Sequence, residues 1–279
     1  MDDSIMLAPL DPTPLHAMRR HLRIWKRFAT QAVVREMHYR ASFVATLVVG
    51  LIQLTLSLIP VLLLYSFAES VNGWGQGEVI ALSGMFQATM ALLAMTVQAN
   101  MNRMSSYVRE GELDLILIRP VSSQFYVTLR WLDPAEVFNI LTGLAVVAIG
   151  LGRAGRTPSG GEIVQSAVLA ASGAVLLTCV WSALVYLAFW FTTVAPIPML
   201  ARDVMDAGRY PLAFYPAAVR AVLGFLVPVG FASTFPVEAL AGRASWWLVL
   251  AGIGLTAAAV ALLRLYWRVA ARNYSSASS

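Results

Sequence analysis

Cysteine, histidine and lysine are scarce in this sequence. The single cysteine, Cys179, lies inside an apolar block, which excludes a disulfide framework and a metal site built from cysteines. The three histidines, His16, His21 and His38, all precede the first long apolar block, so no histidine is available within the blocks that follow. Lys26 is the only lysine, and no Gly-x-x-x-x-Gly-Lys-Ser/Thr motif occurs. The chain therefore has no P-loop with which to hold nucleotide phosphates.

Charge is also scarce. Charged residues make up 13% of the 279 residues, whereas hydrophobic residues make up 58%. Soluble domains have roughly 25% charged and roughly 45–50% apolar residues, so this composition indicates an integral membrane protein and excludes a water-soluble enzyme. The His-Glu-x-x-His and Gly-x-Ser-x-Gly motifs of hydrolases are absent. The formal charge of +5 is divided among the segments between apolar blocks, without the continuous patch of a nucleic-acid-binding protein.

Six apolar stretches have lengths near that needed for a helix to cross the ~30 Å hydrocarbon core. The third gains length from Asp133-Pro-Ala-Glu136, which offers an N-cap, a proline at the first helical position and an acid in the first turn. The fourth is too long for one crossing and should end near Thr193, before Pro196. The predicted spans are 41–68, 79–102, 134–152, 163–193, 219–237 and 244–263.

The fifth span is expected to be irregular. A straight helix is unfavourable there because prolines remove hydrogen-bond donors and kink the backbone. The residues concerned are Gly224, Pro228, Gly230 and Pro236.

The positions of the basic residues predict the orientation of the chain. With six spans and both termini in the cytoplasm, only Arg153, Arg156 and Arg243 lie outside, in agreement with the excess of basic residues in cytoplasmic loops. A five-span arrangement with a re-entrant fifth segment is the alternative, and it would move the three arginines between 264 and 272 to the outside. The residues assigned to the cytoplasmic side include Arg202, Arg209 and Arg220.

Two segments outside the spans are expected to be helical. Within the cytoplasmic segment 1–40, apolar residues recur at helical spacing opposite arginines, which predicts an amphipathic helix that binds anionic lipid at the interface. In the loop 103–133, charges flank an apolar run that is too short to cross the membrane and predict a short interfacial helix. For the N-terminal helix, the alternatives are a surface anchor and a docking site for a partner. For the loop, the alternatives are a solvated connector and a contact with a partner. A cytoplasmic tail, 273–279, follows the six-helix domain of 41–272.

Amide side chains lie within the first two predicted spans, at Gln53, Gln87 and Gln98. Amides in hydrocarbon need partners, so hydrogen bonding between helices is the favoured interpretation and a substrate path is the alternative. No ionisable group is evident at membrane depth, where proton- or ion-coupled carriers usually have one. Energy for uphill transport is therefore expected to enter through a separate subunit.

The loop after the second span resembles a known family. Gly111-Glu-Leu-Asp114 followed by Leu117-Ile-Arg-Pro-Val121 is similar to the cytoplasmic loop of type-2 ABC transporter permeases, in particular a bacterial group of six-span exporter subunits. Arg35-Glu-Met-His-Tyr-Arg-Ala41 and Tyr210-Pro-Leu-Ala-Phe-Tyr-Pro216 are similar to segments of that group before the first span and near the fifth. The resemblance implies a permease of the bacterial inner membrane, paired with a second permease that is the same or different. Some members resemble exporters of cationic compounds such as viologens.

The resemblance also implies a division of labour. The permease would have no enzymatic activity and no cofactor of its own, while separate ATPase subunits would bind ATP and Mg²⁺. In such permeases the loop between spans two and three carries a coupling helix that contacts the ATPase. Carried over to this sequence, the contact residues are Arg109, Glu110, Gly111, Glu112, Leu113, Asp114, Arg119 and Pro120.

Two other functions are compatible with the sequence. One is a non-transporting membrane scaffold whose basic N-terminal helix and loops recruit partners or sense lipid. The other is a channel or secondary carrier, which would transport its substrate alone and without ATP.

Overall fold

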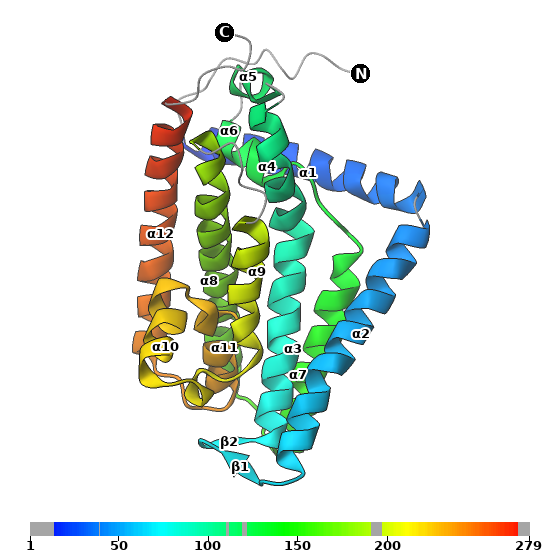
Figure 1. Cartoon of the computed structure of the whole chain (residues 1–279), viewed down its shortest axis with the longest axis vertical. Helices are drawn as coiled ribbons and strands as arrows, with labels where there is room; N and C mark the ends of the chain where they lie inside the picture. Colours follow the sequence, from blue (N-terminus) through cyan, green and yellow to red (C-terminus); the bar gives the residue numbers. More distant parts are fainter. Residues whose placement is uncertain (1–13, 39, 110–111, 119–121, 191–196, 273–279) are drawn as a thin grey trace.

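The long apolar stretches of the sequence form the long helices of a bundle, as the computed structural model in Figure 1 shows. The structure describes residues 14–38, 40–109, 112–118, 122–190 and 197–272. Within these ranges, five helices are long and apolar enough to cross a bilayer: Phe43–Tyr65, Gln76–Met101, Glu136–Arg153, Gly160–Val185 and Trp246–Ala271. A bent pair of shorter helices would make a sixth span if it is counted as one. The prediction of an all-α membrane protein is confirmed, with five or six spans by length and composition.

The first two long helices form a hairpin. α2 (Arg40–Tyr65) and α3 (Gln76–Leu93) are joined by β1 (Ser70–Val71) and β2 (Trp74–Gly75), which pair antiparallel. Asn72 and Gly73 between the strands have φ angles of 48° and 79°, the left-handed conformation that an Asn-Gly turn adopts readily. α3 continues through a π-helical turn, η2 (Ala94–Gln98), into α4 (Ala99–Arg109).

Glycines bring α3 and α7 (Glu136–Arg153) into backbone contact. A Cβ at Gly143 would lie 2.7 Å from the Gly84 carbonyl oxygen, and one at Gly150 would lie 2.6 Å from the Gly77 carbonyl oxygen. No side chain fits in that space, so the two helices touch through their main chains.

The fourth span, α8 (Gly160–Val185), begins with a capping box. Ser159 Oγ accepts a hydrogen bond from the Glu162 N–H at 3.4 Å, and the Glu162 carboxylate accepts one from the Ser159 N–H at 2.6 Å. The helix continues as a 3-10 turn, η3 (Tyr186–Phe189), and its predicted end near Thr193 lies outside the described residues. α12 (Trp246–Arg272) packs against α8 and extends beyond the predicted span 244–263.

The predicted fifth span is broken, as its prolines and glycines indicate. The segments Ala217–Gly224 and Val229–Leu240 are bent by 69° relative to one another. Figure 1 places them beside the starts of α8 and α12, at one end of the bundle. The Asn72 amide nitrogen of the β-turn donates to the Ala213 carbonyl oxygen at 3.0 Å, so this region lies close to the hairpin. The elements are η5 (Leu212–Phe214), α10 (Ala217–Ala221), η6 (Val222–Leu226), η7 (Val229–Phe231) and α11 (Thr234–Leu240).

A helix that the sequence did not predict runs along the bundle. α9 (Ile197–Asp206), followed by the turn η4 (Ala207–Arg209), packs beside α8, and η4 contacts α3. Arg202 and Arg209, which the sequence assigned to a cytoplasmic segment, line a cavity between the helices.

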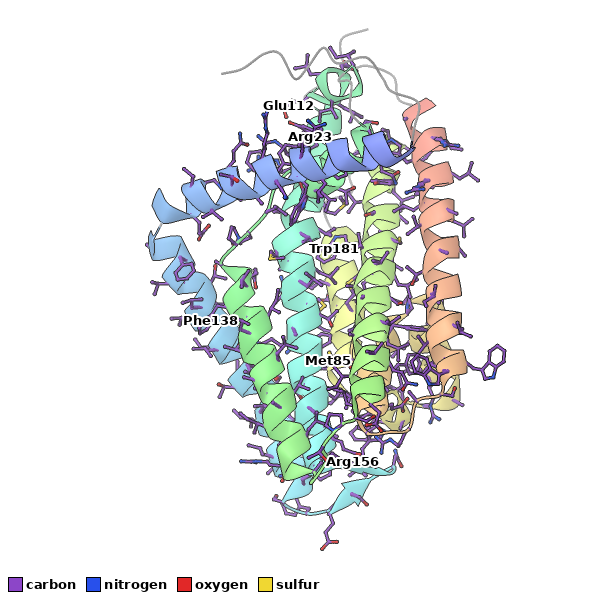
Figure 2. The ribbon with its side chains drawn as sticks, turned by 180° about the vertical axis from the view of Figure 1, so that it is seen from behind. Arg23, Met85, Glu112, Phe138, Arg156 and Trp181 are labelled. Atoms are coloured by element: carbon purple, nitrogen blue, oxygen red, sulfur yellow. The ribbon has the colours of Figure 1, made fainter. Side chains whose placement is uncertain are left out.

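The predicted N-terminal helix is present as α1 (Pro14–His38), and it lies across the end of the bundle near α5 (Glu112–Leu117) and α6 (Ser123–Leu129) (Figure 1). Figure 2 shows Arg23 and Glu112 at this end and Arg156 at the opposite end. Trp131, which precedes α7, contacts α1 there through Arg35. The guanidinium carbons of Arg35, Arg103 and Arg130 lie 5.2, 4.1 and 4.9 Å from the centroid of its ring.

Candidate functional site

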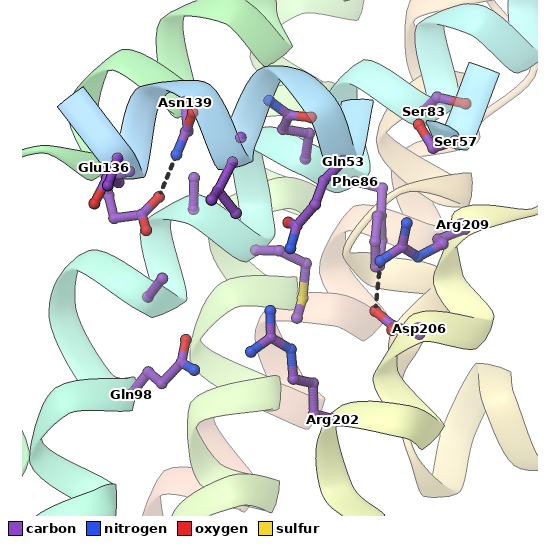
Figure 3. A pocket seen from close by; sticks show the side chains of 18 residues that line it. Gln53, Ser57, Ser83, Phe86, Gln98, Glu136, Asn139, Arg202, Asp206 and Arg209 are labelled. Atoms are coloured by element: carbon purple, nitrogen blue, oxygen red, sulfur yellow. Dashed lines mark hydrogen bonds and ion pairs between the residues drawn. The ribbon is translucent and has the colours of Figure 1, made fainter. Parts of the chain in front are cut away.

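A cavity of about 360 Å³ lies between α2, α3, η2, α7 and α9 (Figure 3). Its walls combine apolar side chains with an unusual number of polar groups for the interior of a membrane bundle. The polar and charged residues that line it include Gln53, Ser57, Ser83, Gln87, Gln98, Glu136, Asn139, Arg202, Asp206 and Arg209. Phe86 and Met90 contribute the larger apolar surfaces.

The three glutamines singled out from the sequence all line this one cavity. Gln87 also donates a hydrogen bond from Nε2 to Thr142 Oγ1 at 3.2 Å, which links α3 to α7. Among the described residues, Gln53 and Gln98 have no such side-chain hydrogen bond. Gln87 thus has the helix-linking bond that the favoured interpretation requires, while Gln53 and Gln98 present their amides to the cavity.

Four charged residues of the cavity were not predicted as site residues. Arg209 Nη2 lies 3.2 Å from Asp206 Oδ1, and the Arg209 guanidinium carbon lies 5.5 Å from the centroid of the Phe86 ring. Glu136 accepts a hydrogen bond at Oε2 from Asn139 Nδ2 at 2.8 Å. Within the described residues, Arg202 forms no ion pair. The cavity therefore contains one compensated pair, one acid and one base.

The sequence does contain a pattern that indicates the charged side of the cavity. Arg202, Asp206 and Arg209 are spaced at i, i+4 and i+7, which places them on one face of a helix. Their proximity to prolines at 196 and 198 favoured a loop instead. Glu136 was interpreted as a first-turn acid of its helix, and it is one; its side chain also reaches the cavity (Figure 3).

The π-helical turn η2 forms one edge of the cavity through Ala94 and Gln98. Such turns interrupt the regular hydrogen bonding of a helix and occur often at functional sites. Here the Met95 carbonyl oxygen accepts a hydrogen bond from the Asp133 N–H at 2.9 Å. Asn100 Nδ2 donates to the Trp131 carbonyl oxygen at 2.7 Å. These hydrogen bonds link the cavity wall to residues 131–133, the segment that α1 contacts through Arg35.

The short helix α5 occupies the region predicted to contact an ATPase. Leu113 and Ile116 are buried, at 0% and 4% exposure, against α4 and α6, whereas Leu115 and Ile118 are 60% and 79% exposed. Glu112 is exposed and Asp114 half-buried. Arg109 is the last residue of α4. The other predicted contact residues, Glu110, Gly111, Arg119 and Pro120, lie outside the described residues.

A helical membrane bundle with a polar cavity between its helices is an arrangement compatible with a transport protein. A family model described as ABC-2 family transporter protein matches residues 51–278. The chain belongs to this family, a family of transmembrane components of ABC transporters, and the resemblance to type-2 ABC permeases is confirmed. No curated protein and no solved structure matches the chain.

Proposed function

We propose that the chain is the permease subunit of an ATP-driven exporter and that separate ATPase subunits act on it through α5. The observation that carries this proposal is the polar cavity lined by membrane-spanning helices in a chain that has no nucleotide-binding motif. The sequence did not lead us to expect the charged residues that line this cavity. Polar and charged groups between membrane-spanning helices are costly and are kept where a substrate or ion passes. ATP and Mg²⁺ are bound by the partner subunits.

The orientation follows from the basic residues at the two ends. Figure 2 shows Arg23 of α1 at one end, where Arg35, Arg103 and Arg130 also meet at Trp131 and where α12 ends with its last arginines. Arg156 lies at the other end, with Arg153 at the end of α7 and with Arg243, which bonds to Gly73 of the hairpin. Arg220 of α10 also lies toward that second end, so it is an exception to the predicted cytoplasmic assignment. Because cytoplasmic segments carry the excess of basic residues, the α1 end is cytoplasmic in a bacterial inner membrane. α5 then faces the ATPase, and both termini are cytoplasmic.

The contacts of α5 support a route for mechanical coupling. Leu113 and Ile116 pack in one cluster with Met104 and Tyr107 of α4. α4 continues through η2 into α3, whose residues line the cavity. A force on the exposed surface of α5 therefore reaches the cavity wall through continuous helix. Leu115 and Ile118 provide the apolar contact with the ATPase, and Glu112 and Asp114 provide the charged contact.

A second permease subunit, identical or different, completes the pathway. α2 exposes most of its apolar surface, including Leu56, Ile59 and Leu63, and contributes Gln53 to the cavity. A partner that packs beside α2 would enclose the cavity between two permeases. Lipid covers the remaining apolar surface.

The first test is purification of the chain in mild detergent from its native host. An ATPase subunit should co-purify at a fixed stoichiometry. A scaffold protein has no such requirement. A channel or secondary carrier would transport substrate in liposomes that contain this chain alone and no ATP, and that result would count against an ABC permease.

The second test replaces Glu112 and Asp114 with arginine. Reversal of two charges at the contact should abolish co-purification of the ATPase, and with it ATP-driven transport. Glu69→Arg, a charge reversal at an exposed site at the other end of the bundle, serves as the control. Retention of a fully coupled complex by the Glu112→Arg, Asp114→Arg variant would show that α5 is not the coupling element.

A further inference from the structure

The cavity contains an acid and a base that are not paired with one another. Asp206 and Arg209 form an ion pair at 3.2 Å and largely compensate each other. Glu136 is bonded to the neutral side chain of Asn139, and Arg202 is in no ion pair within the part of the chain that the structure describes. Figure 3 shows Glu136 entering from α7 and Arg202 from α9, with Gln53 and Gln98 also reaching into the cavity.

This arrangement restricts the charge of a ligand. A purely cationic compound would be attracted to Glu136 but repelled by Arg202, an exposed residue that attracts the Glu136 carboxylate without forming an ion pair among the described residues. A purely anionic compound would be attracted to Arg202 and repelled by Glu136. A molecule with both charges satisfies both residues, and charge-assisted hydrogen bonds to the two groups are stronger than neutral ones. Repulsion between like charges is strong where the surroundings have a low dielectric constant.

The remaining lining favours a compact molecule with an apolar part. Gln53 and Gln98 offer both donors and acceptors, which can bond to either charged group of a ligand. Phe86 and Met90 provide an apolar surface beside them. A volume of about 360 Å³ is near the lower end of the range for small-molecule pockets, about 300–1,000 Å³. It suits a small organic molecule rather than a polypeptide.

We propose that the cavity binds a zwitterionic organic compound, with its cationic group at Glu136 and its anionic group at Arg202. This proposal rests on the proposed function, because the compound is taken to be the substrate that the permease transports. It differs from the cationic substrates that some similar exporters handle, because Arg202, which is in no ion pair among the described residues, lies in the wall of the cavity.

The test uses three probes that share a phenyl group and differ in charge: dimethylbenzylammonium propanesulfonate as the zwitterion, benzyltrimethylammonium as the cation and 3-phenylpropanesulfonate as the anion. Their binding to the purified full-length chain is measured by isothermal titration calorimetry in a nonionic detergent. The zwitterion should bind at least about tenfold more tightly than either other probe. Its sulfonate accepts charge-assisted hydrogen bonds from Arg202, and its quaternary ammonium, which has no N–H, is attracted to Glu136 through its charge.

Two variants should change the ranking in opposite directions. Arg202→Gln should weaken the zwitterion about tenfold and make the cation the preferred probe, while Glu136→Gln should make the anion the preferred probe. A glutamine at 136 can still accept the bond from Asn139, so this variant keeps the local fold. Arg220→Gln and Glu69→Gln, which neutralise exposed residues outside the cavity, should leave the ranking unchanged.

Preference of the wild-type chain for the cation or the anion would overturn the inference, as would binding of none of the three probes. An unchanged ranking in both cavity variants would do the same. The permease assignment is judged separately by the co-purifying ATPase. A stable permease–ATPase complex that prefers the cation would leave the permease function intact and refute only the zwitterionic substrate.

Discussion

Gly50 of α2 lies directly against the side-chain amide of Asn139 in α7. A Cβ at Gly50 would overlap the Asn139 oxygen and would lie 2.7 Å from its Nδ2. Asn139 is buried and donates to Glu136 at 2.8 Å, so the glycine controls both the distance between two spans and the position of a cavity acid.

Gly50→Ala should therefore destabilise the fold. The added methyl group would displace Asn139 or separate α2 from α7, at a cost of about 1–3 kcal/mol for overpacking. Thermal unfolding in detergent measures the effect. Gly152→Ala in α7 is the control, because a Cβ there meets nothing within 4 Å. Equal stability of the Gly50→Ala variant and the wild type would mean that the two helices are not in close contact at this point.

Substitution of the cavity glutamines should affect stability at Gln87 and transport at Gln53. Gln87→Leu removes the 3.2 Å bond to Thr142 and should lower the free energy of unfolding by about 0.5–1 kcal/mol, the range for hydrogen bonds between membrane helices. Gln53→Leu should leave stability nearly unchanged, since the structure shows no side-chain bond of Gln53 among the described residues. Transport should decrease in the Gln53→Leu variant. Similar losses of stability in both variants would contradict this division.

Trp131 should hold α1 on the bundle. Trp131→Leu removes the ring on which Arg35, Arg103 and Arg130 stack and the bond from Nε1 to the Tyr107 hydroxyl at 2.9 Å. Cation–π contacts contribute about 0.5–1 kcal/mol each at exposed sites. Hydrogen exchange over residues 22–36 should increase several-fold in this variant, and Trp247→Leu, at a tryptophan that is 79% exposed, should not change it. Unchanged exchange in the Trp131→Leu variant would assign the anchoring of α1 to other contacts.

Glu36 should make the docking of α1 depend on pH. Burial and the nearby Asp133 carboxylate raise the pKa of Glu36, against the lowering effect of Arg35. An acid whose pKa is raised on docking stabilises the docked state below its ordinary pKa and loses that contribution as the pH rises through the raised pKa. Glu36→Gln should therefore strengthen docking at pH 7 and have no effect near pH 4. Hydrogen exchange of α1, corrected for the intrinsic rate at each pH, provides the measurement. Weaker docking of the variant at pH 7 would reverse the assigned sign.

The spans were predictable because they depend on local sequence. The apolar runs identified α2, α3, α7, α8 and α12, and Gly143 and Gly150 lie where two backbones meet. The break in 219–237 followed from its prolines and glycines. α9 was missed because neighbouring prolines indicated a loop and because its arginines had been used to assign orientation.

The sequence by itself determined that this chain is a helical membrane protein with no nucleotide-binding motif, because hydrophobic run length and motif absence are properties of contiguous residues. Only the tertiary structure decided that Gln53, Glu136 and Arg202 line one cavity. These residues come from helices that are distant in the chain, and their meeting depends on how close α2, α7 and α9 pack. That distance is set by contacts such as Gly50 with Asn139, which no periodicity within a single helix reveals.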